Sequence, residues 1–189
     1  MKTRTTLLLL VLIIASAKFA GAQSTGNAVT DQLLSAYSPR NFTAEPVTDQ
    51  QLDLILKCGI KAPSGRNNQP WRFTVVMDEA TMKEVIGNVV AGNVLILVSG
   101  LESESGKTPD FDCGLATENM FIAATSLGLG ARIYGGPADA ANTKREALQI
   151  PAGYKIVMIL RVGNIDKSVD AVSGASPRKG LEEVVNYKK

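Results

Sequence analysis

A run of amide and hydroxyl side chains between two prolines is the segment of this chain best equipped to bind a ligand. Ser64, Asn67 and Gln69 lie between Pro63 and Pro70, immediately before an aromatic and β-branched stretch. Amides and hydroxyls donate and accept hydrogen bonds, so a loop leading into a strand can present them to a polar, planar ligand. The alternative is a rigid loop whose Asn side chains only cap turns.

Histidine is absent from the sequence, and its absence excludes several kinds of site. Ser-His-Asp and Cys-His catalysis, histidine-ligated zinc and histidine pH switches all need an imidazole. The two cysteines, Cys58 and Cys113, are too few for a four-cysteine metal site. We expect them to be core cysteines or to form one disulfide, and we expect no metal. Redox chemistry in this chain would therefore need a bound cofactor.

Two glycine patterns resemble nucleotide-binding loops but do not meet their requirements. Five residues separate Gly100 from Gly106, two of them glutamates, and Pro109 follows, whereas a P-loop has four intervening residues and continues into a helix. Gly128 and Gly130 lie at the end of an expected helix rather than at its start, so they do not form a dinucleotide fingerprint. We interpret these two glycines as a helix C-cap.

The N-terminus has the pattern of a secretory signal peptide. Lys2 and Arg4 precede an apolar run at 7–15, which is too short to span a bilayer, and small residues follow it. We expect cleavage after Ala22, with cleavage after Ala17 as the alternative. An uncleaved N-terminal anchor is a further alternative.

The expected cleavage divides the chain into a signal peptide at 1–22, a polar linker at 23–28 and one domain at 29–189. The formal charge of the sequence is +2, and removing the signal peptide removes three basic residues and no acid, which changes it to −1. A near-neutral chain lacks the basic surface of a nucleic-acid-binding protein. We therefore expect an exported protein, periplasmic or secreted, that binds no nucleic acid and keeps no membrane span.

Hydrophobic periodicity predicts the elements that must position the loop. Aromatic and β-branched stretches predict strands, and apolar residues three or four positions apart predict helices. The strands are expected at 71–77, 94–98, 131–134 and 155–162, and the helices at 29–38, 48–61, 79–90, 111–129, 138–148 and 181–185. Thr48 and Gln51 form a possible capping box. This order predicts an α+β (α/β layered) domain, a sheet of four to five strands flanked by helices.

Five short motifs occur in order between Leu33 and Val185. They are Ser38-Pro39-Arg40, Pro63-Ser64-x-x-Asn67-x-Gln69-Pro70-Trp71, Glu118-Asn119-Met120 with the following Leu127 to Gly130, Ile133-Tyr134-Gly135-Gly136, and Arg178-Lys179 with the residues after it. Together they resemble the nitroreductase family of FMN-dependent oxidoreductases. The second motif is the most specific and is similar to the flavin-contacting loop of that family.

The resemblance implies a nitroreductase-like FMN-binding domain with a mixed central sheet. It also implies a homodimer with one FMN in each of two clefts between the subunits. The residues implied to contact FMN are Ser38, Arg40, Pro63, Ser64, Asn67, Gln69, Tyr134, Gly135, Gly136, Arg178 and Lys179.

In family terms, these residues have different roles around the flavin. Arg40 would stabilise negative charge on the pyrimidine side of the reduced ring, and Asn67 would hydrogen-bond ring or ribityl oxygens. The backbone N–H of Gly135 would lie near the reactive nitrogen of the ring. Arg178 or Lys179 would hold the phosphate together with Ser38.

The resemblance implies an FMN-dependent oxidoreductase that reduces nitroaromatic, quinone-like or similar acceptors, and the signal-peptide pattern adds that it is exported. NAD(P)H is the usual hydride donor of the family, but it is a cytoplasmic metabolite, so the donor of an exported member is open. Ala36 occupies the position of the family's first basic residue in the segment that holds FMN. This departure favours an alternative, a protein that binds a flavin or another planar ligand without turnover.

Overall fold

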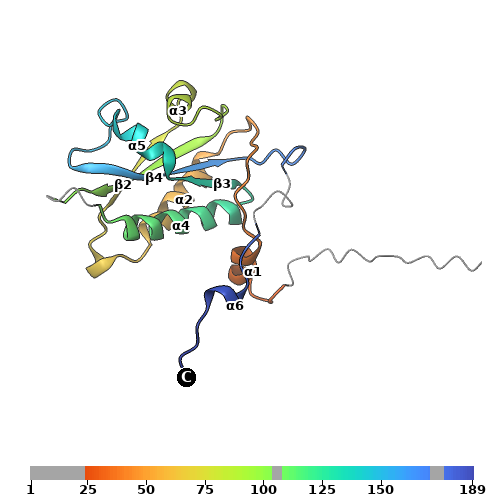
Figure 1. Ribbon diagram of the computed structural model, residues 1–189. Coiled ribbons are helices and arrows are strands. Elements are labelled where there is room, and N and C mark those ends of the chain that lie inside the picture. The colour runs from red at the N-terminus through yellow and green to blue at the C-terminus, as the bar shows by residue number, and fades with distance from the viewer. Residues whose placement is uncertain (1–23, 104–107, 171–176) are drawn as a thin grey trace, which may run out of the picture.

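A four-stranded sheet forms the centre of the computed structural model, which describes residues 24–103, 108–170 and 177–189 (Figure 1). The strands are β1 (Trp71–Val76), β2 (Val94–Leu101), β3 (Gly130–Tyr134) and β4 (Tyr154–Gly163). Their order in the sheet is β1-β2-β4-β3, and all three neighbouring pairs are antiparallel. β2 and β3 run in the same direction but are not adjacent, because β4 inserts between them.

Helices cover both faces of the sheet, as Figure 1 shows. The helices on one face are α2 (Asp49–Ile60) and α4 (Asp110–Ser126), and those on the other are α3 (Glu79–Val85) and α5 (Gly136–Asn142). Successive side chains of a strand point to opposite faces. In β2, Ile96 belongs to the core cluster that includes α4, whereas Leu95 belongs to the cluster that includes α3 and α5. This strand, buried from Val94 to Gly100, therefore supplies both cores.

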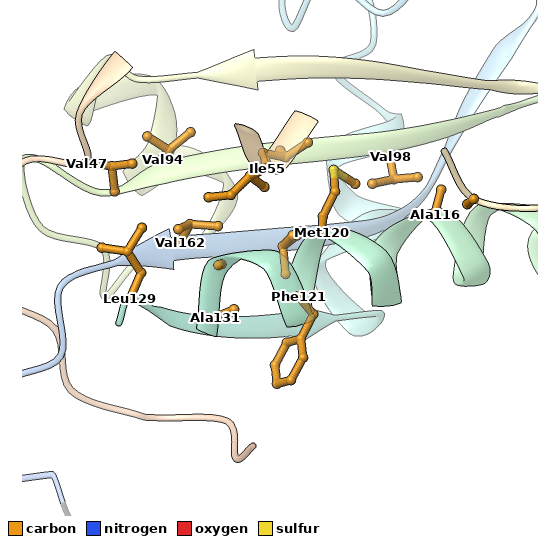
Figure 2. Close-up of a cluster of buried hydrophobic side chains, with 14 of the residues drawn as sticks. Val47, Ile55, Val94, Val98, Ala116, Met120, Phe121, Leu129, Ala131 and Val162 are labelled. Carbon is orange, nitrogen blue, oxygen red and sulfur yellow. The ribbon is translucent and has the colours of Figure 1, made fainter. Parts of the chain in front are cut away.

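The larger core lies between the sheet and the helices α2 and α4. Figure 2 shows Ile55 and Met120 meeting there, next to Val162 of β4. The two helices pack closely at Gly59, where an added Cβ would lie 2.7 Å from Met120 Cγ. Because only glycine leaves that space, Gly59 sets the distance between α2 and α4.

Two short helices stand outside these layers. α1 (Ala28–Ser35) begins at Asn27, whose side chain accepts hydrogen bonds from two backbone N–H groups, and α6 (Leu181–Val184) lies near the C-terminus. Neither helix has a buried residue. Both carry exposed large apolar side chains, such as Leu34, at 65% exposure, and Leu181, at 72%. In the described chain their apolar faces are therefore largely uncovered.

The local signals at helix ends are confirmed. Thr48 and Gln51 form the expected capping box at the start of α2. Gly128 has a φ of +78° just after α4, and its N–H and that of the next residue donate to carbonyls of the last turn. The interpretation as a helix C-cap is therefore confirmed for Gly128, since a left-handed residue there favours glycine, but it is wrong for Gly130, which is the first residue of the next strand, β3.

The α+β layers and the number of strands are confirmed, and four other expectations are corrected. The helix expected at 29–38 ends at Ser35, since Ala36 adopts an extended backbone. The sheet of the described chain contains antiparallel pairs rather than a mixture, because β4 separates the two strands that run in the same direction. The helix expected at 79–90 ends at Val85, since Ile86 adopts an extended backbone. The helix expected at 138–148 runs from Gly136 to Asn142 and gives way to turns.

Two further expectations concern cysteine and the membrane. Cys58 is exposed, Cys113 is buried, and both are free, so Cys113 is a core cysteine and the pair forms no disulfide. Within the described ranges, no helix has the length and apolar character needed to cross a membrane. The expected signal peptide at 1–22 falls outside the described residues.

Candidate functional site

The loop between α2 and β1 is shaped by two side-chain hydrogen bonds. Ser64 Oγ accepts a hydrogen bond from the backbone N–H of Gln69 at 3.0 Å, which closes the loop on itself. The N–H of Gly65 donates to Asp112 Oδ1, in the first turn of α4, at 3.1 Å. The Ser64 hydroxyl and the Asp112 carboxylate therefore fix the loop shape and its place beside α4.

Three residues of the same loop have a left-handed backbone. The φ angles are 52° at Arg66, 58° at Asn67 and 47° at Gln69. A non-glycine residue in this region costs about 1–2 kcal/mol, and such strain is concentrated at functional sites. The side chains of all three residues are exposed. The strained turn thus presents two amides and a guanidinium to a ligand that approaches from solvent.

The segment 37–42 carries two of the expected site residues across one end of the sheet. Its Pro39 carbonyl accepts a hydrogen bond from Arg132 Nη1 at 3.4 Å. The ring of Phe42 packs under the guanidinium of Arg161, whose carbon is 4.1 Å from the ring centre. These contacts with β3 and β4 fix the segment, while Ser38 and Arg40 within it remain exposed.

Arg161 is a buried charge close to this segment. Its side chain donates to Asn93 Oδ1 at 2.8 Å and to Asn88 Oδ1 at 3.3 Å, and the residue is only 1% exposed. Burial lowers the pKa of Arg161, and the hydrogen bond and charge of Tyr134 act in the opposite direction. The guanidinium is therefore held by neutral amide oxygens, a phenol and an aromatic ring.

A groove of about 400 Å³ brings together two of the expected phosphate contacts. Ser38 and Arg178 both line it, although they lie far apart in the sequence. The other side chains of the groove come from α1 and the two residues after it, from α4 and from β3, and most are apolar: Leu33, Leu34, Ala36, Tyr37, Glu118, Phe121, Ile122 and Ile133. Lys179 and Arg40 are not among the residues that line this groove.

The backbone at the end of β3 faces open space. Gly135 and Gly136 are exposed, and a Cβ added to either glycine would meet no atom within 4 Å. The neighbouring Tyr134 lies under the guanidinium of Arg132, with 5.4 Å between the guanidinium carbon and the ring centre. A planar molecule can therefore approach this backbone closely, which glycines permit.

The expected site residues form three groups in one chain. Ser38 and Arg178 share the groove, the loop 63–70 lies between α2 and β1, and Gly135 directly follows β3. None of the residues that line the groove of Ser38 comes from the loop 63–70. The structure thus unites only part of the expected set within a single chain.

Comparison with known proteins identifies the family to which this arrangement belongs. The sequence profile of the nitroreductase family matches residues 33–97 and 92–164, which is most of the chain. The chain belongs to the nitroreductase family. The resemblance inferred from the five motifs is therefore confirmed.

Nitroreductase relatives agree in sequence and in structure. An Archaeoglobus fulgidus protein named as an NADH dehydrogenase/NAD(P)H nitroreductase is 31% identical over 137 residues, 67% of this chain and 79% of its own. A Vibrio harveyi NADPH-flavin oxidoreductase is 26% identical over 162 residues, 75% of this chain and 68% of its own. A Desulfovibrio desulfuricans nitroreductase solved with FMN is 32% identical, with a TM-score of 0.73 over 86% of this chain and 98% of that one. The expected enzyme class, a flavin-dependent oxidoreductase, is thus confirmed at the level of the family.

Asp112 and Asp170 are residues of this chain that sequence reasoning missed. Asp112 anchors Gly65, and Asp170 accepts a hydrogen bond from the N–H of Arg40 at 2.7 Å. Neither belongs to a motif. Each is far in sequence from the segment it holds, so only the tertiary contact reveals it.

Proposed function

We propose that this protein is an exported, FMN-dependent oxidoreductase that reduces nitroaromatic or quinone-like small molecules. The carrying observation is the groove in which the Ser38 hydroxyl and the Arg178 guanidinium lie beside mostly apolar side chains. Hydroxyl and guanidinium groups are strong donors to a phosphate monoester, and apolar side chains cover a flavin. The donor set therefore fits FMN, and relatives solved with FMN support this ligand.

Ala36 also lines this groove, at the position where the family pattern has its first basic residue. A lost hydrogen bond to a charged group costs about 1.5–3 kcal/mol. We therefore expect FMN affinity to be lower than with a full basic set, and part of the flavin to leave during purification.

Bound FMN would supply the hydride-transfer chemistry between a donor and an acceptor, and the residues of this chain would hold and tune it. The exposed cation of Arg40 stabilises negative charge near the ring, because an ionised donor strengthens hydrogen bonds to an anion. The amide of Asn67 donates to polar atoms of the cofactor. The open backbone at Gly135 allows close approach of a planar ring.

We propose that the working form is a homodimer. α1 has no buried residue, and a groove of about 850 Å³ runs between α1, α2 and α4 with Val29, Leu33, Leu54 and Ile122 among its side chains. Exposed apolar faces of this kind mark interaction surfaces. A second copy would cover them, and its loop 63–70 could complete the site that one chain leaves divided.

The electron donor and the location are linked parts of the proposal. The names of relatives support NAD(P)H as donor, whereas the signal-like N-terminus supports export to a compartment where that donor is scarce. N-terminal sequencing of protein from fractionated cells tests export, and a mature chain that begins at Gln23 is expected. An intact N-terminus in the cytoplasmic fraction would contradict it.

The first experiment is the visible absorbance spectrum of the purified protein before and after addition of FMN, with the released chromophore identified after denaturation. We expect a flavin spectrum with about one FMN per subunit. Anaerobic titration with NADH, NADPH and dithionite then identifies the donor. No flavin after reconstitution would overturn the proposed function.

A second candidate, a flavin-binding protein without turnover, is favoured by the lost cation at Ala36. It differs from the first in one measurement. Sustained reduction of a quinone or nitroaromatic compound by the FMN-loaded protein with any donor would exclude it.

A further inference from the structure

We propose that Asp170 is a positioning residue that holds the segment carrying Ser38 and Arg40 and thereby sets the affinity for FMN. Asp170 follows β4 and is far in sequence from this segment. The inference rests on the proposed function, since FMN is the ligand whose affinity it concerns.

The Asp170 carboxylate collects several donors from one short segment. Its Oδ1 accepts hydrogen bonds from the backbone N–H of Arg40 at 2.7 Å and of Asn41 at 3.1 Å. The side-chain amide of Asn41 donates to the same oxygen at 3.3 Å. A single oxygen thus fixes the direction of two successive peptide groups, and the side chains on both sides follow that direction.

The charge of Asp170 is well suited to this role. Burial acts to raise its pKa, but hydrogen bonds from the backbone of Arg40 and Asn41 and from the side chains of Tyr37 and Asn41 together lower it below the ordinary value. The carboxylate is therefore ionised near neutral pH. Hydrogen bonds to an ionised acceptor are about twice as strong as neutral ones.

The location of Asp170 indicates that it acts through the segment rather than on FMN. It lines a separate groove of about 370 Å³ with Tyr37 and Lys167, next to the groove of Ser38 and Arg178. A carboxylate near a phosphate also repels it. If Asp170 acted on FMN only through its charge, removing that charge would tighten FMN binding, whereas loss of the contacts that position the segment weakens it. The sign of the change separates the two roles.

The experiment compares Asp170→Ala and Asp170→Asn with the control Asp166→Asn in the full chain. The Asp166 carboxylate lies in the same segment but is engaged by the N–H and hydroxyl of Ser168. FMN affinity is measured by fluorescence titration, and exchange of backbone amide hydrogens is measured by NMR without FMN. Thermal denaturation of each variant shows whether it is folded.

We expect Asp170→Ala to raise the Kd for FMN about tenfold or more, because several charge-assisted hydrogen bonds are lost. The amides of Arg40 and Asn41 should exchange faster, while those of β2 stay protected. Asp170→Asn, which keeps an acceptor oxygen, should lie between Asp170→Ala and the wild type, and Asp166→Asn should bind FMN at least as tightly as the wild type.

Two results would overturn the inference, and they can be told apart from failure of the proposed function. Wild-type affinity in Asp170→Ala, or unchanged exchange at Arg40 and Asn41, removes the positioning role alone. A wild-type protein that does not bind FMN overturns the proposed function and the role together. If the Ala variant is unfolded, Asp170→Asn and its amide exchange decide between these results.

Discussion

Single carboxylates shape the candidate site although they carry none of its expected contacts. Asp112 fixes Gly65, and Asp170 fixes Arg40, in each case through a backbone N–H. The direct contacts are left to cations, amides and open backbone. Neither aspartate lines the groove of Ser38 and Arg178, where Glu118 is the one carboxylate among the lining residues.

Arg178 and Lys179 are adjacent basic residues, but only Arg178 lines the groove of Ser38. We expect Arg178→Gln to weaken FMN binding about tenfold, since a charged hydrogen bond to phosphate is lost. Riboflavin, which has no phosphate, should bind the variant and the wild type alike. The matched control Lys179→Gln should change FMN affinity little. Fluorescence titration of both flavins measures these effects, and equal losses in both variants would contradict the placement.

Burial decides the chemistry of Cys113. Desolvation, followed by the charges of Asp110 and Asp112, raises the pKa of its thiol to about 12. The thiol therefore stays protonated and unreactive at pH 8–9 in the folded protein. In the unfolded chain the Cys113 thiol keeps its ordinary pKa of 9.0. Above pH 9 the unfolded state therefore loses a proton that the folded state retains, so the free energy of unfolding falls as pH rises.

A thiol-reagent assay at pH 8 checks this expectation. In the native protein Cys58 should react and Cys113 should not. Adding denaturant should make Cys113 reactive as well, and mass spectrometry identifies which cysteine carries the label. Rapid native labelling of Cys113 would contradict its place in the core.

The packing of α2 against α4 positions the loop 63–70, because that loop begins where α2 ends and is tied to α4. Gly59 allows this packing. An alanine Cβ there would lie 2.7 Å from Met120 Cγ and 3.1 Å from Phe73 Cε2. The position of the loop relative to the two helices therefore depends on the absence of a side chain at Gly59.

We expect Gly59→Ala to destabilise the fold by about 1–3 kcal/mol, because overpacking outweighs the gain in helix propensity. The control is Gly114→Ala in α4, where an added Cβ meets no atom within 4 Å. That variant should be stabilised by up to about 1 kcal/mol. Urea denaturation measures both values. An increase in stability for both variants would show that α2 and α4 do not approach as closely as described.

At the scale of the whole molecule, apolar surface remains where the chain itself provides no cover. The groove between α1, α2 and α4 is the largest of those described above, and α1 and α6 both carry exposed large apolar side chains. Together with the division of the expected site residues into three groups, this surface supports the proposed homodimer. The cofactor site and the subunit contact would then depend on each other.

Leu54→Glu tests that dependence. Leu54 is 42% exposed and lines the groove between α1, α2 and α4, so a charge there should shift a dimer towards monomer. The control is Met77→Glu, since Met77 is 51% exposed but follows β1, away from that groove. Light scattering coupled to size exclusion measures the mass. We expect the Leu54 variant to lose FMN together with its partner, and an FMN-loaded monomer would contradict a shared site.

The sequence by itself determined the features that depend on neighbouring residues. The β-branched and apolar residues at 94–98 indicated a strand, Thr48 and Gln51 indicated a helix start, and Gly128 indicated a helix end. Each signal comes from side chains and backbone groups within a few residues of one another. The order of motifs likewise indicated the family and the residues expected at the flavin.

Only the tertiary structure decided what depends on residues distant in sequence. The insertion of β4 between β2 and β3 made the sheet of the described chain antiparallel. Which strands become neighbours depends on how helices distant in sequence pack on the two faces of the sheet. The left-handed backbone at Arg66 and Asn67 has no glycine to signal it and is held by contacts around the loop. The role of Asp170 was recognised only from the structure, in which its carboxylate accepts a hydrogen bond from the N–H of Arg40. Backbone donors are the same at every residue, so a sequence does not record which distant carboxylate accepts from them.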